Sequence, residues 1–207
     1  MADPQPFRLI LASGSPARRE LLTRYGYTFE VQPANIEEPT EAGHGDPRSY
    51  VQQIAWMKAA AVAKSADDGV ILAADTVGWC DGRPVLKPDD EADARRILTM
   101  LAGRTHELWT GVCLWRQPDG LQLAWQELSS VSMKPMTDAD IDSYLTTRQW
   151  EGCSGAYAIQ EQGDPLLTVE GSVTNVVGLP MESLARNLPL IDFKSPPVAT
   201  GGPDSKS

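Results

Sequence analysis

A set of charged and hydroxyl side chains in the N-terminal half of the chain is suited to phosphate chemistry. Cations such as Arg18 and Lys58 can hold the oxygens of a phosphate ester or anhydride, and a carboxylate such as Asp75 can bind a metal ion or activate water. Two to four cations with two or three carboxylates therefore indicate metal-assisted attack on phosphorus. The set comprises Ser13, Ser15, Arg18, Glu38, Lys58, Asp75 and Lys87.

The first three of these residues lie in a predicted strand–turn–helix segment. Leu9 to Ala12 predicts a buried strand, Ser13-Gly-Ser15 a polar turn with Ser15 as N-cap, and Pro16 the first helical position. Arg18 stands at the third helical position, where the helix dipole disfavours a cation, so a bound anion would resolve the conflict. The alternative is an ordinary strand-to-helix connection with solvated arginines.

The two carboxylates are predicted to come from a loop and a strand. A short strand is predicted over residues 27–32. Glu38 falls in the polar stretch 34–45 that follows, where a carboxylate is either solvated or a metal ligand. Asp75 directly follows the apolar run 70–74, which predicts a buried central strand, and ligands of α/β proteins gather near strand ends. A hairpin then returns Lys87 to the same neighbourhood.

Lys58 is predicted to lie on the inner face of a helix that begins at Asp46-Pro47. It stands four residues beyond Ile54 and seven beyond Val51, which form the apolar stripe of that helix. The lysine is either a snorkelling side chain at the edge of the stripe or an ammonium directed into an anionic site.

The C-terminal half predicts further helices and strands. The predicted elements are a helix over 89–102, two antiparallel strands over 107–116 and 121–133, a capped helix from Thr137 to Leu145, a strand over 166–169, a turn over 171–175 and a helix over 181–187. Residues 1–6 and 194–207 are rich in proline, glycine and polar residues and are predicted to be flexible.

Composition excludes several classes of protein. The net charge of −10 argues against nucleic-acid binding but leaves room for a small anionic ligand held by a local cluster of cations. No apolar run approaches the roughly 20 residues of a membrane span, and the N-terminus does not resemble a secretory signal. The three cysteines are widely spaced and predict free thiols in a reducing cytoplasm.

The order and spacing of the motifs resemble the Maf family of nucleoside triphosphate pyrophosphatases, also described as septum-formation inhibitors. The resemblance runs from about residue 8 to residue 190. The pieces that carry it are Leu11-Ala-Ser-Gly-Ser-Pro-Ala-Arg-Arg-Glu-Leu-Leu22, Ile36-Glu-Glu38, Lys58, Ala74-Asp-Thr76, Lys87-Pro88, Gly103-Arg-Thr-His106, Thr110-Gly-Val112, Gly155-Ala-Tyr-Ala-Ile-Gln160 and Asn175-Val-Val-Gly-Leu-Pro180.

The resemblance implies a fold, a reaction and an assembly. The expected fold is one α/β domain over residues 7–193, with an elongated mixed sheet in two lobes and a central cleft, similar to the inosine triphosphate pyrophosphatases. The expected reaction is hydrolysis of a nucleoside triphosphate to the monophosphate and pyrophosphate with Mg²⁺ or Mn²⁺. The expected assembly is a homodimer in the cytoplasm, with no nucleic-acid or membrane partner.

The resemblance also implies a role for each matching residue. Asp75 resembles the general base, and Glu38 resembles a carboxylate that organises metal or water, so both are expected as metal ligands. The expected triphosphate clamp consists of Arg18, Lys58 and Lys87, assisted by Ser13 and Ser15. The expected nucleobase pocket includes Thr76 and Gln160.

Two motifs resemble the branch of the family that acts on dTTP and UTP, namely Ala74-Asp-Thr76 and Ala156-Tyr-Ala-Ile-Gln160. The branch acting on 7-methyl-GTP tends to have glutamine after the aspartate. Ala17 departs from the pyrimidine branch, which usually has arginine there, so hydrolysis of 7-methyl-GTP or modified nucleotides is the alternative. A nucleotide-binding regulator of septum formation is the alternative from outside the enzymes.

Overall fold

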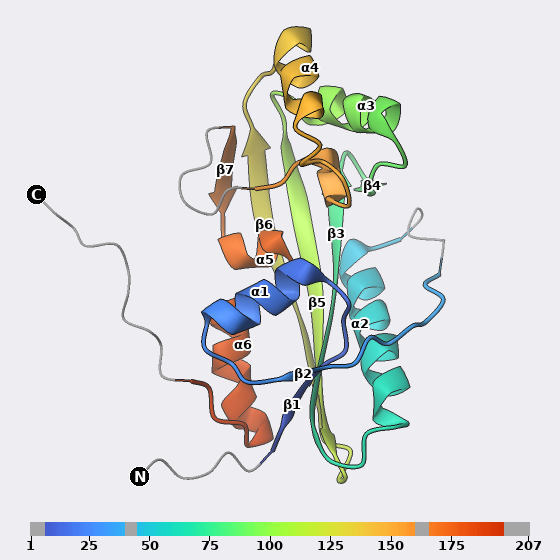
Figure 1. Cartoon of the computed structure of the whole chain (residues 1–207), viewed down its shortest axis with the longest axis vertical. Coiled ribbons are helices and arrows are strands. Elements are labelled where there is room, and N and C mark those ends of the chain that lie inside the picture. The colour runs from blue at the N-terminus through green and yellow to red at the C-terminus, as the bar shows by residue number, and fades with distance from the viewer. Residues whose placement is uncertain (1–6, 40–44, 160–165, 197–207) are drawn as a thin grey trace, which may run out of the picture.

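One seven-stranded mixed sheet runs the length of the molecule (Figure 1). The computed structural model describes residues 7–39, 45–159 and 166–196. The strands lie in the order β2-β1-β3-β5-β6-β7, with β4 pairing on β3; β2, β1 and β3 are parallel and the other pairs are antiparallel. Their bounds are β1 Leu9–Leu11, β2 Glu30–Val31, β3 Gly69–Cys80, β4 Arg83–Val85, β5 Thr105–Gln117, β6 Gln122–Met133 and β7 Leu167–Glu170.

Helices cover both faces of this sheet. The α-helices are α1 Pro16–Arg24, α2 Pro47–Ala63, α3 Glu91–Leu101, α4 Asp138–Thr146, α5 Val173–Val177 and α6 Met181–Asn187, and two 3₁₀ turns are η1 Ser154–Ala156 and η2 Leu188–Ile191. None of the described helices combines the length and hydropathy that a membrane span requires.

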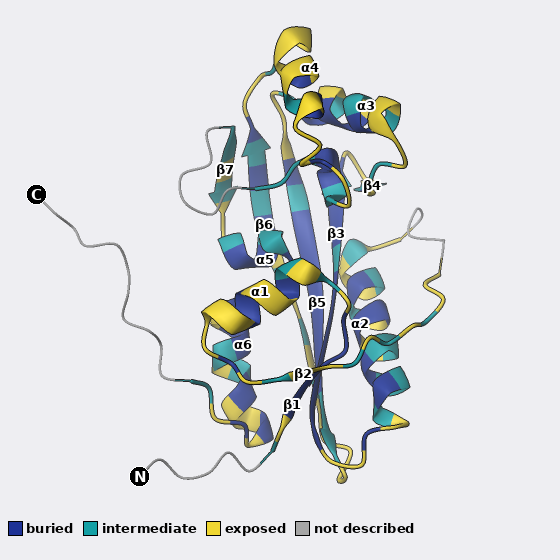
Figure 2. Ribbon diagram, viewed as in Figure 1, coloured by how far each residue is buried: buried dark blue, intermediate teal, exposed yellow. Residues whose placement is uncertain are grey.

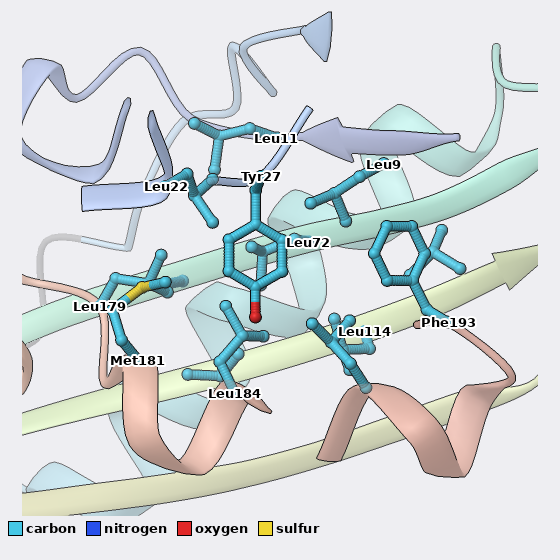
Figure 3. Close-up of a cluster of buried hydrophobic side chains, with 14 of the residues drawn as sticks. Leu9, Leu11, Leu22, Tyr27, Leu72, Leu114, Leu179, Met181, Leu184 and Phe193 are labelled. Carbon is cyan, nitrogen blue, oxygen red and sulfur yellow. The ribbon is translucent and has the colours of Figure 1, made fainter. Parts of the chain in front are cut away.

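Strand alternation divides the central core into two layers. Leu72, Ala74 and Leu114 pack with α1 and α6 on one face (Figure 3). Ile71 and Cys113 pack with α2 on the other face. A separate core lies at the far end of the sheet, under α3 and α4 (Figures 1 and 2). The molecule therefore has two lobes along one mixed sheet, which confirms the predicted α/β class.

Several predicted local features are confirmed. Ser15 caps α1, Asp46 caps α2, and Thr137 forms a reciprocal capping box with Asp140. All three cysteines are free thiols, and Cys153 is the one that is only partly buried.

Three predicted elements differ from the structure. The strand predicted to end before Asp75 continues through it to Cys80, because β5 pairs with it along that whole length. The strand predicted over residues 27–32 is only two residues long. The turn predicted over 171–175 is the start of α5, whose amides are capped by Ser172 and which ends at Gly178, where φ is 119°.

Candidate active site

The site lies on a free stretch of the edge of β3. Its neighbour β1 pairs only as far as Leu72, and β4 begins to pair at Gly78. Between these points the described chain places no strand on this edge of β3, whose other edge pairs with β5, and Asp75 and Thr76 lie there. The prediction that Asp75 follows the end of its strand is therefore wrong, because β3 continues to Cys80; Asp75 lies at a free edge because β1 ends before it.

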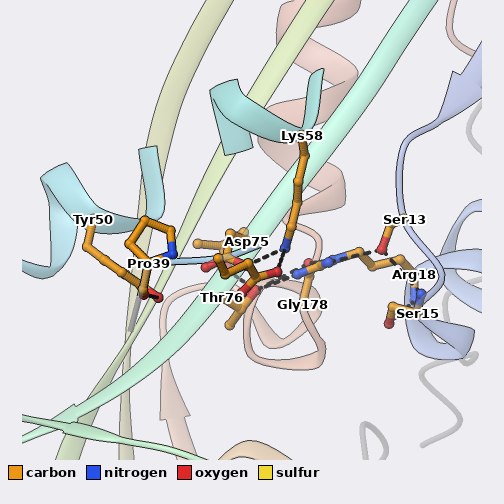
Figure 4. Close-up of polar contacts among 11 residues, drawn as sticks. Ser13, Ser15, Arg18, Pro39, Tyr50, Lys58, Asp75, Thr76 and Gly178 are labelled. Atoms are coloured by element: carbon orange, nitrogen blue, oxygen red, sulfur yellow. Dashed lines mark hydrogen bonds and ion pairs between the residues drawn. The ribbon is translucent and has the colours of Figure 1, made fainter. Parts of the chain in front are cut away.

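Successive residues of β3 point to opposite faces of the sheet, so the site has two sides. Asp75 pairs with Gly111 on the side of α2, and Thr76 pairs with Thr110 on the side of α1 and α5. Figure 4 shows the two side chains between Lys58 and Arg18, which come from those helices.

Lys58 joins two carboxylates on the α2 side. Its Nζ lies 2.7 Å from an oxygen of Asp75 (Figure 4). The same Nζ lies 2.7 Å from an oxygen of Glu38. The side chains of Lys58 and Asp75 are 13% and 12% exposed, whereas that of Glu38 is 46% exposed. The ammonium is thus directed into an anionic site rather than out to solvent, and the more open carboxylate belongs to the loop.

Arg18 is buried on the other side and is held by three hydrogen bonds. Its Nε donates to the Gly178 carbonyl at 2.8 Å, and its two Nη atoms donate to the hydroxyls of Ser13 at 3.1 Å and Thr76 at 3.2 Å. Burial lowers the pKa of Arg18, while the charges of Asp75 and Glu38 raise it. A guanidinium has five N–H groups, so two are left without a partner among the described residues and can bind a ligand such as a phosphate.

A hydroxyl network extends from Arg18 to α5. The Thr76 and Thr110 hydroxyls are 2.9 Å apart, and Thr110 also donates to the Asn175 carbonyl at 3.3 Å. The Asn175 amide in turn donates to the Leu108 carbonyl of β5 and the Ser129 hydroxyl of β6. Sequence reasoning gave Thr110, Asn175 and Gly178 no role, although all three lie in the motifs that carry the family resemblance.

Gly111 allows α2 to approach the sheet at Asp75. A Cβ on Gly111 would lie 2.3 Å from the Val51 carbonyl oxygen and 2.7 Å from the Gln52 nitrogen, closer than real Cβ atoms come to any neighbour. Gly111 is the cross-strand partner of Asp75, so this contact sets the height of α2 above the Asp75 carboxylate.

Tyr50 lies one residue before that contact, in the first turn of α2. Its hydroxyl donates to the Pro39 carbonyl at 3.4 Å, next to Glu38 (Figure 4). Burial raises the pKa of Tyr50, and the charges of Asp75 and Glu38 raise it further, so the hydroxyl stays protonated.

Comparison with known proteins gives the family. The family described as Maf-like protein matches residues 8–190. The chain belongs to this family. A dTTP/UTP pyrophosphatase of Rhodopirellula baltica is 39% identical over 98% of this chain and 90% of its own length. The dTTP/UTP pyrophosphatase of Anaeromyxobacter sp. is 43% identical over 95% of this chain and 96% of its own length. That of Moorella thermoacetica is 41% identical over 84% of this chain and 90% of its own length.

Among solved structures, the Staphylococcus aureus Ham1 protein aligns with 61% of this Maf-like chain and 71% of its own. The TM-score is 0.43 and the sequence identity is 13%.

The structure does not bring every predicted site residue of this Maf-like chain into the cluster. Lys87 is exposed after β4, and among the described contacts none joins it to Asp75. Burial raises the pKa of Cys153, and the charge of Lys87 opposes that rise. Gln160 lies outside the described residues, as does His44. Thr76 contacts Arg18, so it lies beside a predicted phosphate-binding residue. Burial lowers the pKa of His106 to about 4, and its Nδ1 has no hydrogen-bond partner among the described residues.

Glu38 and Asp75 fit a divalent cation of the Mg²⁺ type. Both carboxylates reach one cation, Lys58 Nζ, so hard oxygen ligands are gathered at one place. Mg²⁺ is typically bound by one or two carboxylates, with substrate phosphates and water completing its shell. Over residues 7–39, 45–159 and 166–196, no group of three or more His, Cys, Asp or Glu side chains could hold a metal.

Proposed function

We propose that this Maf-like chain hydrolyses nucleoside triphosphates, dTTP and UTP foremost, to the monophosphate and pyrophosphate. The observation that carries the proposal is the pair of carboxylates on Lys58, with Arg18 buried beside them at the free edge of β3. A general base and phosphate-binding cations at one place are what attack by water on a phosphoanhydride needs. The names of the relatives support the same reaction and the pyrimidine substrates.

In the proposed reaction, Asp75 accepts a proton from the attacking water. The water oxygen bonds to the α-phosphorus, the bond from that phosphorus to the oxygen bridging to the β-phosphate breaks, and pyrophosphate leaves. Lys58 and the two free N–H groups of Arg18 stabilise the charge that develops on the phosphate oxygens. Lys58 also keeps Asp75 and Glu38 in place before substrate arrives.

A divalent cation, Mg²⁺ or Mn²⁺, belongs to the same proposal. The four charged side chains of the cluster, Glu38, Lys58, Asp75 and Arg18, sum to a formal charge of zero, which leaves the charge of a triphosphate uncompensated. The cation would be held by Glu38 and Asp75, and it would supply charge neutralisation and orientation of the phosphates.

The remaining predicted residues keep their roles as proposals. Lys87 joins the phosphate clamp, Ser13 and Ser15 assist it, and Thr76 and Gln160 contact the nucleobase. Homodimerisation and a cytoplasmic location stay predictions, and light scattering on the purified protein tests the first.

Pyrophosphate release from the purified protein tests the proposed function. The panel is dTTP, UTP, CTP, GTP, 7-methyl-GTP and modified pyrimidine triphosphates, each with Mg²⁺ or Mn²⁺. Release from dTTP or UTP is expected. Preference for 7-methyl-GTP would mean that Ala17 outweighs the pyrimidine-branch motifs. Nucleotide binding without release would favour the regulator of septum formation instead.

A further inference from the structure

Within the described part of the chain, the loop that carries Glu38 makes few polar contacts with the rest of the protein. Residues 33–39 form neither helix nor strand, and their exposure is intermediate to high. Among the hydrogen bonds and ion pairs described for this loop, two tie its acidic end to α2. One is the ion pair from Glu38 to Lys58. The other is the hydrogen bond from Tyr50, whose side chain is seen beside Pro39 in Figure 4, to the Pro39 carbonyl.

These two contacts differ in whether a bound triphosphate would compete for them. Lys58 already serves two carboxylates, and a triphosphate would compete for its ammonium. The hydroxyl of Tyr50 is neutral and its partner is a backbone carbonyl, so phosphate binding does not compete for it. The Tyr50 contact therefore remains when Lys58 turns towards substrate.

The position of Tyr50 is itself set by the sheet. The Val51 carbonyl rests on Gly111, which pairs with Asp75, and Tyr50 is the preceding residue. Tyr50 and Lys58 are eight residues apart, just over two turns of α2, so one rigid helix carries both attachments. Tyr50 therefore links the position of the Glu38 loop to the position of β3, the strand that holds Asp75.

We propose that Tyr50 is a positioning residue that holds Glu38 at the site through the Pro39 carbonyl. It acts by restricting the loop and does not itself touch the reacting atoms. This inference rests on the proposed function for its kinetic part only, because the restriction of the loop can be measured without turnover.

The test is Tyr50→Phe, which removes only the hydroxyl. Tyr27→Phe is the matched control, because it also removes a tyrosine hydroxyl that has a partner, Ser195, but Tyr27 is buried in the core under α1 and α6. Hydrogen–deuterium exchange is expected to rise in peptides covering residues 34–39 of Tyr50→Phe, and to stay unchanged there in Tyr27→Phe. Unchanged exchange in the loop of Tyr50→Phe would overturn the proposal.

A double-mutant cycle with Glu38→Gln separates positioning from general destabilisation. Tyr50→Phe is expected to lower kcat with dTTP about 3- to 10-fold, with KM nearly unchanged, since one neutral hydrogen bond is lost. In the Glu38→Gln background the same change should alter kcat less than about twofold. Equal losses in both backgrounds would contradict positioning through Glu38. If the parent protein releases no pyrophosphate, the proposed function fails, and the exchange result still decides on Tyr50.

Discussion

Gly111→Ala tests whether the contact between α2 and the sheet sets the geometry of the site. The new Cβ would lie 2.3 Å from the Val51 oxygen, against the 3.0 Å below which real Cβ atoms essentially never come, so α2 must move by about 0.7 Å. The obstructing atoms are backbone, which cannot rotate aside as a flexible side chain can. Overpacking of this kind costs about 1–3 kcal/mol, which outweighs the roughly 0.4–1 kcal/mol gained from a stiffer unfolded chain.

The same shift of α2 displaces Lys58 and Tyr50, which both belong to this helix. Since a misplacement of about 1 Å can cost ~10²-fold in rate, kcat/KM for pyrophosphate release should fall at least about 10-fold. Urea unfolding and steady-state kinetics measure the two effects. Gly45→Ala is the control, because no described residue beyond its chain neighbours lies within 4 Å of the added methyl group. Unchanged stability and rate in Gly111→Ala would refute the claim that this contact fixes α2.

Three further predictions concern single groups. Asp75→Asn should lower kcat about 10²- to 10⁴-fold while calorimetry still detects nucleotide binding, and normal turnover would exclude Asp75 as the base. Arg18→Lys keeps the charge but loses the forked contacts, so the free energy of unfolding should fall by about 1–3 kcal/mol and nucleotide affinity should weaken. A variant with the same stability and the same nucleotide affinity as the parent would show that Arg18 does not bind substrate. Burial holds the pKa of His106 at about 4, below its value of about 6.5 in the unfolded chain. Because the unfolded chain therefore binds a proton first, the free energy of unfolding falls as the pH drops from about 6.5 towards 4. At about pH 5 the loss should be about 2 kcal/mol relative to pH 7.5, and His106→Gln should lack it in urea titrations; an identical pH dependence would contradict this.

The sequence by itself determined the local structure around the candidate residues. The N-caps at Ser15 and Asp46, each followed by proline, predict the starts of α1 and α2 because capping depends on neighbours within one turn. The position of Lys58 on an apolar stripe was likewise visible from spacing alone. The motif order gave the family, since the same residue types recur at the same separations over most of the chain.

Only the tertiary structure decided how these residues meet. Where β1 ends depends on its pairing partner, and this places Asp75 at a free edge although its own strand continues. The Gly178 carbonyl at the end of α5 accepts a hydrogen bond from Arg18, 160 residues away, and no local pattern encodes that contact. Position 111 needs glycine because the Val51 backbone lies against it. The Tyr50 hydrogen bond joins α2 to the Pro39 carbonyl in the Glu38 loop. Each depends on the packing of elements distant in sequence, which local propensity does not specify.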